Sequence, residues 1–260
     1  MLVDSHCHLP KVKEEVHKII EEANAEGVVK FICVGTHIKD SQHAIFLAEK
    51  LAPVFATIGI YPHEEQALSL DQMKAELQQL LQTSKKIVAI GECGIDISNW
   101  EGGRTVEDQL PIFEMQIQLA LENDLPIIIH NRNGDELVLK TLQKYKSPKL
   151  RGIAHCFASS WEVAQQFVDL NFYISFSGLI TYPSRKDLLE TVKNVPNDKF
   201  LVETDSPYLP PQGHRGEKNE PKYVKIVAQK VAETRQQTFE ETCKLAYENT
   251  CRIFGPALFA

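Results

Sequence analysis

The chain alternates between short apolar runs and longer stretches in which apolar residues recur every three to four positions. The short runs are rich in β-branched residues, as buried strands are, and the longer stretches have the spacing of helices that pack one face on a sheet. The pattern predicts eight strands, at Leu2–Ser5, Val28–Val34, Val54–Ile58, Ile87–Ile90, Pro126–Ile129, Arg151–Ala154, Phe172–Phe176 and Lys199–Glu203.

The helical spacing falls between these strands. It is clearest in Lys11–Ala25, Asp40–Leu51, Leu70–Gln82, Thr105–Asn123 and Trp161–Leu170. A strand that is followed by a helix and then by another strand is typical of parallel strands joined by crossover helices. The order therefore predicts an α/β fold with a parallel sheet.

Eight strand and helix units favour closure into a (β/α)8 TIM barrel. An open, doubly wound sheet is the alternative, but such a sheet ends nearer to about six strands and places its site at one switch point. The 260 residues contain no linker rich in glycine and serine, no low-complexity tract and no sequence repeat. We therefore expect residues 1–260 to form a single (β/α)8 domain.

The composition is that of an ordinary globular protein, with 43% hydrophobic and 24% charged residues. No apolar run approaches the ~20 residues that cross a bilayer, and the first residues lack the features of a signal peptide. We expect a cytoplasmic protein with no membrane partner and no obligate protein partner. The six cysteines form no CxxC pair, which favours free buried thiols.

Histidines and carboxylates follow several of the predicted strands. His6 and His8 end the first strand, and alternation places both imidazoles on one face with Cys7 on the other. This pair alone is a weak signal, because a three-residue pattern often arises by chance. The same place after four further apolar runs is taken by Glu92, His130, His155 and Asp205.

The carboxyl ends of barrel strands meet at one mouth, so these six side chains are expected to converge. Any one of them could be a structural residue, but five independent strand ends argue against that for the set. Four imidazoles and two carboxylates are costly to desolvate without cations between them. The pattern predicts two divalent metal ions, with Glu92 bridging them. Mixed histidine and carboxylate ligands accept Mg²⁺, Mn²⁺, Zn²⁺ or Co²⁺, so the sequence does not identify the metal. We expect Cys7, Cys93 and Cys156 to pack away from the mouth.

These strand-end motifs resemble those of the TatD family of metal-dependent deoxyribonucleases, within the amidohydrolase-like metal barrels. The resemblance runs nearly end to end. Its most specific stretches are Asp-Ser-His-Cys-His-Leu at 4–9, Ala-Ile-Gly-Glu at 89–92, Leu-Pro-Ile-Ile-Ile-His-Asn-Arg at 125–132, His-Cys-Phe at 155–157 and Leu-Val-Glu-Thr-Asp-Ser-Pro-Tyr-Leu at 201–209. The resemblance implies that His6, His8, Glu92 and Asp205 hold one ion and that Glu92, His130 and His155 hold the other.

The resemblance also implies the substrate, which is single-stranded DNA digested from its 3′ end. Two loops depart from the family pattern. Residues 94–97 read Gly-Ile-Asp-Ile where the family commonly has Gly-Leu-Asp-Tyr, and Tyr61 stands where a further histidine is frequent. Neither change touches an expected ligand, but both loops shape the substrate pocket.

Three carboxylates are the candidates for catalysis. Two divalent ions flanking a water molecule lower its pKa, an arrangement suited to hydrolysing phosphodiesters or acyl groups. Asp205 can ligate an ion and also accept the water's proton, so it is the candidate general base, and Glu92 bridges the ions. Glu203 is expected to hydrogen-bond a ligand or a leaving group, and a purely structural role for it is equally open.

Substrate contacts are expected in the loops after the strands. The net charge of −7 gives no global attraction for nucleic acid, so phosphate binding must be local. The candidates for phosphate contact are His63, Arg132, Arg215 and Lys218, although Arg132 could instead form a rim salt bridge and Lys218 could be a solvated charge. One aromatic ring is expected to stack bases, among Tyr61, Trp100, Phe157 and Tyr208.

Two other functions fit the same residues. An ester or amide hydrolase, acting on aminoacyl-tRNA or a small cyclic amide, would need the same activated water. Many such barrels use a carbamylated lysine after strand four, so Glu92 at that place favours the nuclease. A non-catalytic metal-dependent binding protein is the third hypothesis, and the presence of every ligand together with Asp205 argues against it.

Overall fold

The computed structural model describes residues 1–11 and 15–258. These residues form one sheet of eight parallel strands, whose order in space is their order along the chain. The strands are β1 (Leu2–Cys7), β2 (Val28–Val34), β3 (Val54–Ile58), β4 (Ile87–Asp96), β5 (Ile127–Arg132), β6 (Gly152–Ala154), β7 (Phe172–Phe176) and β8 (Phe200–Val202).

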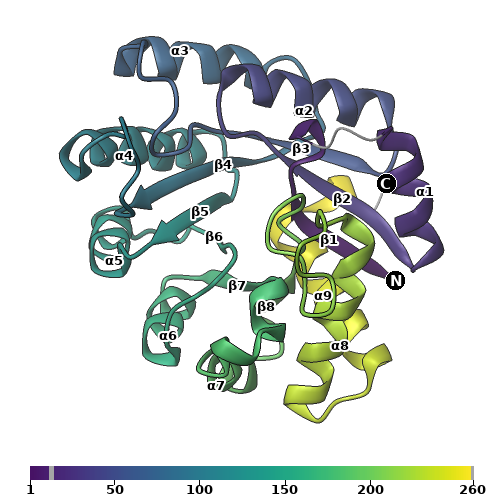
Figure 1. The fold of residues 1–260 in the computed structure, drawn as a ribbon. Helices are drawn as coiled ribbons and strands as arrows, with labels where there is room; N and C mark the ends of the chain where they lie inside the picture. Colours follow the sequence, from purple (N-terminus) through teal and green to yellow (C-terminus); the bar gives the residue numbers. More distant parts are fainter. Residues whose placement is uncertain (12–14, 259–260) are drawn as a thin grey trace.

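The first and last strands meet and close the sheet. Cys7 forms a parallel bridge with Ser206, and the backbone N–H of His8 donates to the Ser206 carbonyl at 2.7 Å. The N–H of Asp205 donates to the carbonyl of His6 at 2.9 Å. The predicted (β/α)8 TIM barrel is thereby confirmed, with helices around the ring of strands (Figure 1).

The helices lie between the strands as the spacing predicts. They are α1 (Val16–Ala25), α2 (Ile38–Lys50), α3 (Leu70–Leu81), α4 (Val106–Glu122), α5 (Asp135–Lys144), α6 (Trp161–Asp169), α7 (Leu188–Asn194), α8 (Val224–Arg235) and α9 (Phe239–Phe254). The helix expected from Lys11 begins later, at Val16, since Lys11 ends a short 3-10 helix (Leu9–Lys11). Residues 12–14 of that prediction lie outside the described residues.

Side-chain caps determine where several helices begin. Ser69 accepts a hydrogen bond from the N–H of Gln72, whose side chain in turn accepts from the Ser69 N–H, so α3 begins with a capping box. Thr105 caps α4 and Thr238 caps α9 by accepting from the N–H three residues further on. His37 does the same for α2, which explains why this helix begins two residues before the predicted Asp40.

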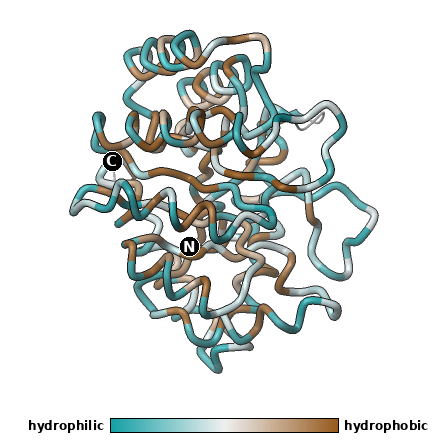
Figure 2. Tube along the Cα trace, turned by 90° about the vertical axis from the view of Figure 1, so that its left-hand side faces the viewer, coloured by the Kyte–Doolittle hydropathy of each residue, from teal (hydrophilic) through white to brown (hydrophobic). Residues whose placement is uncertain are grey.

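Two apolar layers hold the barrel together. The outer layer lies between strands and helices and contains, for example, Phe31 and Leu77. The inner layer takes residues from all eight strands, such as Val3 and Phe55, and joins them to Phe254 and other residues at the C-terminal end of the chain. Most brown, apolar segments in Figure 2 accordingly lie inside the molecule. The buried charged side chains of the strands, such as Glu92 and Asp96, lie beyond this apolar layer toward one end of the barrel.

Irregular pairing in β1 and β4 turns side chains toward that end. The register with the neighbouring strand shifts between Asp4 and Cys7 in β1, and between Ile90 and Cys93 in β4. Ile90 and Cys93 both belong to the outer layer although they are three residues apart, so the shift breaks the two-residue alternation. β4 therefore continues to Asp96 instead of ending at the predicted Ile90.

Candidate metal centre

Six polar side chains converge at the carboxyl ends of the strands. His6, Glu92 and His130 lie within β1, β4 and β5. His8 and His155 directly follow β1 and β6, and Asp205 lies three residues after the end of β8. All are buried except His130, whose side chain is 16% exposed. The structure therefore brings together every residue that the sequence predicted as a ligand: His6, His8, Glu92, His130, His155 and Asp205.

One group of ligand atoms surrounds the Oε2 atom of Glu92. The Nε2 atoms of His6 and His8 lie 3.4 and 3.6 Å from Oε2. Asp205 Oδ1 lies 3.7 Å from His6 Nε2 and 3.3 Å from His8 Nε2. The two Nε2 atoms are themselves only 3.2 Å apart.

A second group surrounds the other carboxylate oxygen of Glu92. Oε1 lies 2.8 Å from His130 Nδ1 and 3.0 Å from His155 Nε2. These two nitrogens are 3.5 Å apart. Glu92 thus presents one oxygen to each group, which is the geometry of a carboxylate that bridges two cations.

The spacing within both groups fits a bound cation. Ligand atoms at tetrahedral bond lengths of about 2.0–2.1 Å lie about 3.3 Å from one another. The distances here, from 2.8 to 3.7 Å, scatter around that value. Nitrogen and carboxylate donors of this kind suit divalent transition metals, and both groups can hold one ion.

The outer nitrogens of two imidazoles orient the rings. Nδ1 of His8 lies 3.1 Å from the carbonyl oxygen of Val34. Nδ1 of His155 lies 3.3 Å from Oε1 of Glu203. Because a carbonyl or carboxylate oxygen can only accept, each Nδ1 carries a proton, so each Nε2 is the nitrogen that can bind a metal ion when it carries no proton.

The ring of His130 is oriented by residues that the sequence had not singled out for this purpose. Its Nε2 lies 3.2 Å from the hydroxyl of Tyr61 and 3.5 Å from Asp96 Oδ2, and the Tyr61 hydroxyl donates to the same carboxylate. Glu92 and Asp96 are four residues apart on β4, so continued alternation was the signal that could have found Asp96. His6 differs, since its Nδ1 has no hydrogen-bond partner within residues 1–11 and 15–258.

The pKa values of Glu92 and His155 are shifted in directions that favour a positive charge at the centre. Burial alone would raise the pKa of Glu92, but the charge of His155 and hydrogen bonds from His130 and His155 lower it well below its usual range. Burial likewise lowers the pKa of His155, and the charges of Glu92 and Glu203 outweigh burial and raise it. A divalent cation would supply the positive charge that a proton on His155 otherwise supplies.

Glu203 lies beside the expected ligands and contacts one of them. It is fully buried, and its Oε1 accepts a hydrogen bond from the Cys156 N–H at 2.7 Å as well as from His155. Its Oε2 has no hydrogen-bond partner in the described part of the chain. Glu203 also lies near enough to His6 and His155 to join a further group of potential metal ligands.

The expectation for the three cysteines is confirmed for two and wrong for the third. Cys7 and Cys93 are fully buried in the outer apolar layer. Cys156 is outside both apolar layers, and its Sγ lies 3.1 Å from the Ser177 hydroxyl. The reason is local: β6 ends at Ala154 and Cys156 has a left-handed backbone (φ 43°), so strand alternation no longer applies.

Comparison with known proteins agrees with this geometry. The sequence model of TatD related DNases matches residues 3–255. The chain belongs to the TatD family. It is 39% identical to the uncharacterized metal-dependent hydrolase YabD of Bacillus subtilis over 259 residues, which cover 98% of this chain and 99% of YabD.

Two Escherichia coli proteins are similar to this chain over nearly their whole length. The metal-dependent hydrolase YcfH is 34% identical, covering 97% of this chain and 95% of YcfH. The crystal structure of the TatD homologue YjjV superposes with a TM-score of 0.91 at 29% identity, covering 98% of each chain. This TatD-family chain is therefore a metal-dependent hydrolase. None of the helices described is long and apolar enough to span a membrane.

The predicted substrate contacts of this TatD-family chain occupy different environments. His63 is buried, and its Nδ1 accepts a hydrogen bond from the Arg104 N–H at 3.1 Å. Arg132 is exposed at the end of β5, and the exposed Arg215 places its guanidinium 4.5 Å from the centre of the Tyr182 ring. Lys218 is exposed as well.

The four candidate stacking rings differ in the same way. Phe157 is buried against Phe167, so it cannot stack a base, which corrects its place among the candidates. Tyr61 is half-buried over His130. Trp100 and Tyr208 are 50% and 48% exposed, and Tyr208 approaches His8 with ring centres 5.8 Å apart.

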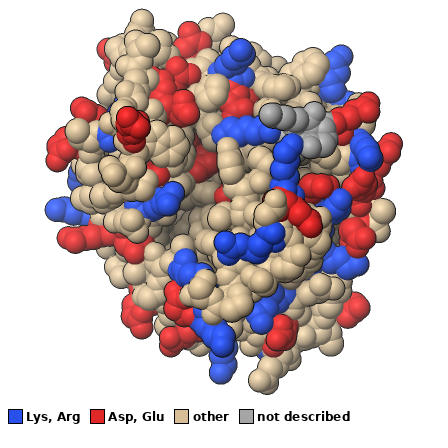
Figure 3. Space-filling model, viewed as in Figure 1, with Lys and Arg blue, Asp and Glu red and all other residues tan. Residues whose placement is uncertain are grey.

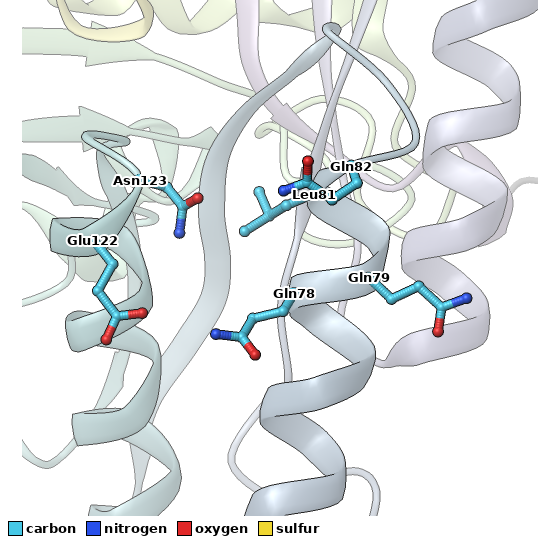
Figure 4. A pocket seen from close by; sticks show the side chains of 6 residues that line it. All are labelled: Gln78, Gln79, Leu81, Gln82, Glu122 and Asn123. Carbon is cyan, nitrogen blue, oxygen red and sulfur yellow. The ribbon is translucent and has the colours of Figure 1, made fainter.

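The surface has two hollows, which differ in the side chains that line them. Seen from the side of Figure 1, the surface is hollowed in front of the ring of strands, with Lys and Arg side chains around the rim (Figure 3). A second hollow lies between the carboxyl ends of α3 and α4, which lead to the opposite ends of the strands. Amides such as Gln78 and Asn123 dominate that hollow (Figure 4), so it lacks the ligands of the metal centre.

Proposed function

We propose that this TatD-family hydrolase is a deoxyribonuclease that removes nucleotides from the 3′ end of single-stranded DNA and uses two divalent ions. The observation that carries the proposal is Glu92, whose two oxygens face two separate groups of ligands. The name of the matching family supports DNA as the substrate. Exposed Arg132 and Arg215, with Lys and Arg on the rim of the hollow (Figure 3), support binding of phosphates.

The chemistry divides among the chain's own residues. Divalent ions held by the six ligands would lower the pKa of a water molecule and stabilise charge on the substrate's oxygens. Asp205 accepts the proton of the attacking water, because its carboxylate faces the metal-ligating His6 and His8 and is ionised. Burial acts to raise the pKa of Asp205, but the hydrogen bond with His8 and the charge of His6 outweigh burial and lower that pKa. Glu203 orients His155 through Nδ1.

The first test is a comparison of substrates with different metals. Purified protein is stripped of metal, reloaded with Mg²⁺, Mn²⁺, Zn²⁺ or Co²⁺ and offered single-stranded DNA, RNA and aminoacyl-tRNA side by side. The proposal expects cleavage of DNA with at least one metal. Hydrolysis of the aminoacyl ester with intact DNA would instead identify an ester hydrolase on the same centre.

The second test concerns direction. An oligonucleotide blocked at its 3′ end should resist cleavage, while the same oligonucleotide blocked at its 5′ end should be shortened one nucleotide at a time. Denaturing gels of end-labelled DNA distinguish the two. Cleavage of circular DNA, or equal cleavage of both blocked substrates, would contradict an exonuclease that starts from the 3′ end.

A further inference from the structure

We propose that Trp100 and Arg132 form a nucleotide subsite beside the metal centre, in which a nucleobase stacks on the exposed face of Trp100 and Arg132 binds an adjacent phosphate. The inference rests on the proposed nuclease function and names the residues that would recognise the DNA. It extends the site on the side of His130, away from Tyr208 and His8.

The Trp100 side chain is partly covered and partly exposed. It stacks on His63 with ring centres 5.1 Å apart and an angle of 26° between the planes. The residue is nevertheless 50% exposed, which is unusual for so large an apolar ring. With His63 on one face, the exposed half of the ring is available to a ligand, and bases of any sequence can stack on it.

Hydrogen bonds hold the loop that carries Trp100. The N–H of Gly103 donates to the Trp100 carbonyl at 3.0 Å, and Gln66 Nε2 donates to the carbonyl of Gly102 at 2.9 Å. At the start of the loop, the Ser98 N–H donates to Asp96 at 2.8 Å. A ring that is already positioned costs little conformational entropy when a base stacks on it.

A chain of aromatic contacts connects Trp100 to the metal centre. The Tyr61 ring lies 5.9 Å from Trp100 and 4.6 Å from His130, measured between ring centres. His130 in turn contacts the bridging carboxylate of Glu92. Only the Tyr61 ring therefore separates Trp100 from a candidate ligand, so a base stacked on Trp100 can belong to a nucleotide next to the phosphate being cleaved.

Arg132 supplies a positive charge at the same place. It pairs in register with Asp96 on the neighbouring strand, and Asp96 binds Tyr61. Its side chain is exposed and, within residues 1–11 and 15–258, makes no hydrogen bond or ion pair, whereas the nearby Arg104 donates to the carbonyls of Pro62 and Glu64. An exposed guanidinium with no acceptor can bind a phosphate without losing an existing partner.

The binding test uses DNA with non-hydrolysable phosphorothioate linkages, so that affinity is measured without cleavage. Trp100→Ala should weaken binding about 5- to 100-fold, as loss of one stacked base does, while Trp100→Phe should retain much of the affinity. Phe46→Ala, which removes an exposed ring from α2, is the matched control and should bind as the unmodified protein does.

Abasic DNA shows whether the lost contact is a base. Affinities of the unmodified protein and of Trp100→Ala are measured for oligonucleotides that each lack one base, at successive positions from the 3′ end. At the stacked position, removal of the base should weaken binding to the unmodified protein and leave binding to Trp100→Ala unchanged. Additive losses at every position would overturn the proposal.

Salt dependence separates the two residues. Arg132→Gln should make the plot of log affinity against log salt shallower by about 0.7, the value for one phosphate contact on a single strand. Trp100→Ala should leave that slope unchanged, since stacking releases no counterions. An unchanged slope for Arg132→Gln would overturn its assignment to phosphate.

Fluorescence reports on Trp100 directly, because the chain has only two tryptophans. Trp161→Phe leaves Trp100 as the reporter, and its emission should be quenched as DNA binds; unchanged emission at saturating DNA would overturn the proposal.

Cleavage assays keep this proposal distinct from the nuclease function. If the unmodified protein cleaves DNA and Trp100→Ala has the same KM, the subsite is wrong and the nuclease stands. If no metal gives DNA cleavage or binding, the nuclease itself fails and the subsite fails with it.

Discussion

At the scale of single residues, the centre depends on the charge of Glu92. Glu92→Gln keeps the shape of the side chain but leaves a neutral amide between two groups of ligands. We expect hydrolysis to fall to background and bound metal to decrease, with the circular dichroism spectrum unchanged because the apolar layers are untouched. Glu122→Gln, on the exposed surface of α4, is the control. Near-normal turnover of Glu92→Gln would contradict a two-metal centre.

Asp205 has two roles that a single substitution can separate. Asp205→Asn can still bind metal through its amide oxygen, and asparagine tolerates the left-handed backbone at this position (φ 59°). If Asp205 accepts the proton, turnover should fall about 10²- to 10⁴-fold while bound metal is retained. Turnover and metal content are measured on the same preparation. Unchanged turnover would exclude Asp205 as the base, and loss of both would leave it a ligand only.

The residues of the centre could be predicted because each follows an apolar run, and barrel geometry brings such positions together. Their partners were harder to find. Two-residue alternation would place the side chains of Asp4 and His6 on the same face of β1. The register shift between Asp4 and Cys7 breaks this alternation, so the two side chains have different partners. Nothing local marks such a shift, and contacts like that between Glu203 and His155 join residues far apart in sequence.

At the scale of elements, Gly91 allows the irregular pairing that aims Glu92 at the centre. Its φ is 127°, and an added Cβ would lie 2.6 Å from the carbonyl oxygen of Ile128 on β5. Gly91→Ala should therefore cost several kcal/mol, since backbone strain of about 1–3 kcal/mol adds to the clash. Activity should fall with it. Urea denaturation and the cleavage assay measure the two effects.

The control for this element is Gly27→Ala. Gly27 also has a positive φ, of 86°, but an added Cβ there would have no atom within 4 Å. It should show only the backbone strain of about 1–3 kcal/mol and full activity. If Gly91→Ala and Gly27→Ala lost equal amounts of stability and activity, close packing of Gly91 against β5 would not be what positions Glu92.

Element types could be predicted better than their ends. All eight strands lie where the apolar runs placed them. β8 ends at Val202 rather than Glu203, because the backbone beyond it turns to pair with β1. The short helix α7 offers only 7 residues in which periodicity can show. Contacts between α9 and the inner layer are tertiary and have no counterpart in local sequence.

At the scale of the whole molecule, the metal centre depends on closure of the barrel. One ligand group takes His6 from β1, His8 from the position directly after β1 and Asp205 from the segment after β8. The two ends of the sheet must therefore meet before that group exists. This dependence supports our proposal that residues 1–260 act as one domain. The count of eight units predicted closure, but the contacts that secure it lie about 200 residues apart and are invisible to any local pattern.

The Asp4 carboxylate secures this closure. It accepts hydrogen bonds from the N–H of Thr204 at 2.9 Å and from the Thr204 hydroxyl at 2.5 Å. Thr204→Val keeps the side-chain shape and removes the hydroxyl, which leaves a buried acceptor short of one donor. We expect a loss of about 1–3 kcal/mol in the free energy of unfolding. Metal affinity should fall as well, because His6 and Asp205 lie on the two sides of the joint.

Thr242→Val is the matched control for this prediction. Thr242 is equally buried, in α9, but its hydroxyl has no hydrogen-bond partner among the residues described. Replacing an unpaired buried hydroxyl with a methyl group should be neutral or slightly stabilising. Urea denaturation measures stability, and titration calorimetry measures metal binding. If both variants lose stability equally, or if Thr204→Val binds metal as tightly as the unmodified protein, closure through Asp4 does not govern the metal centre.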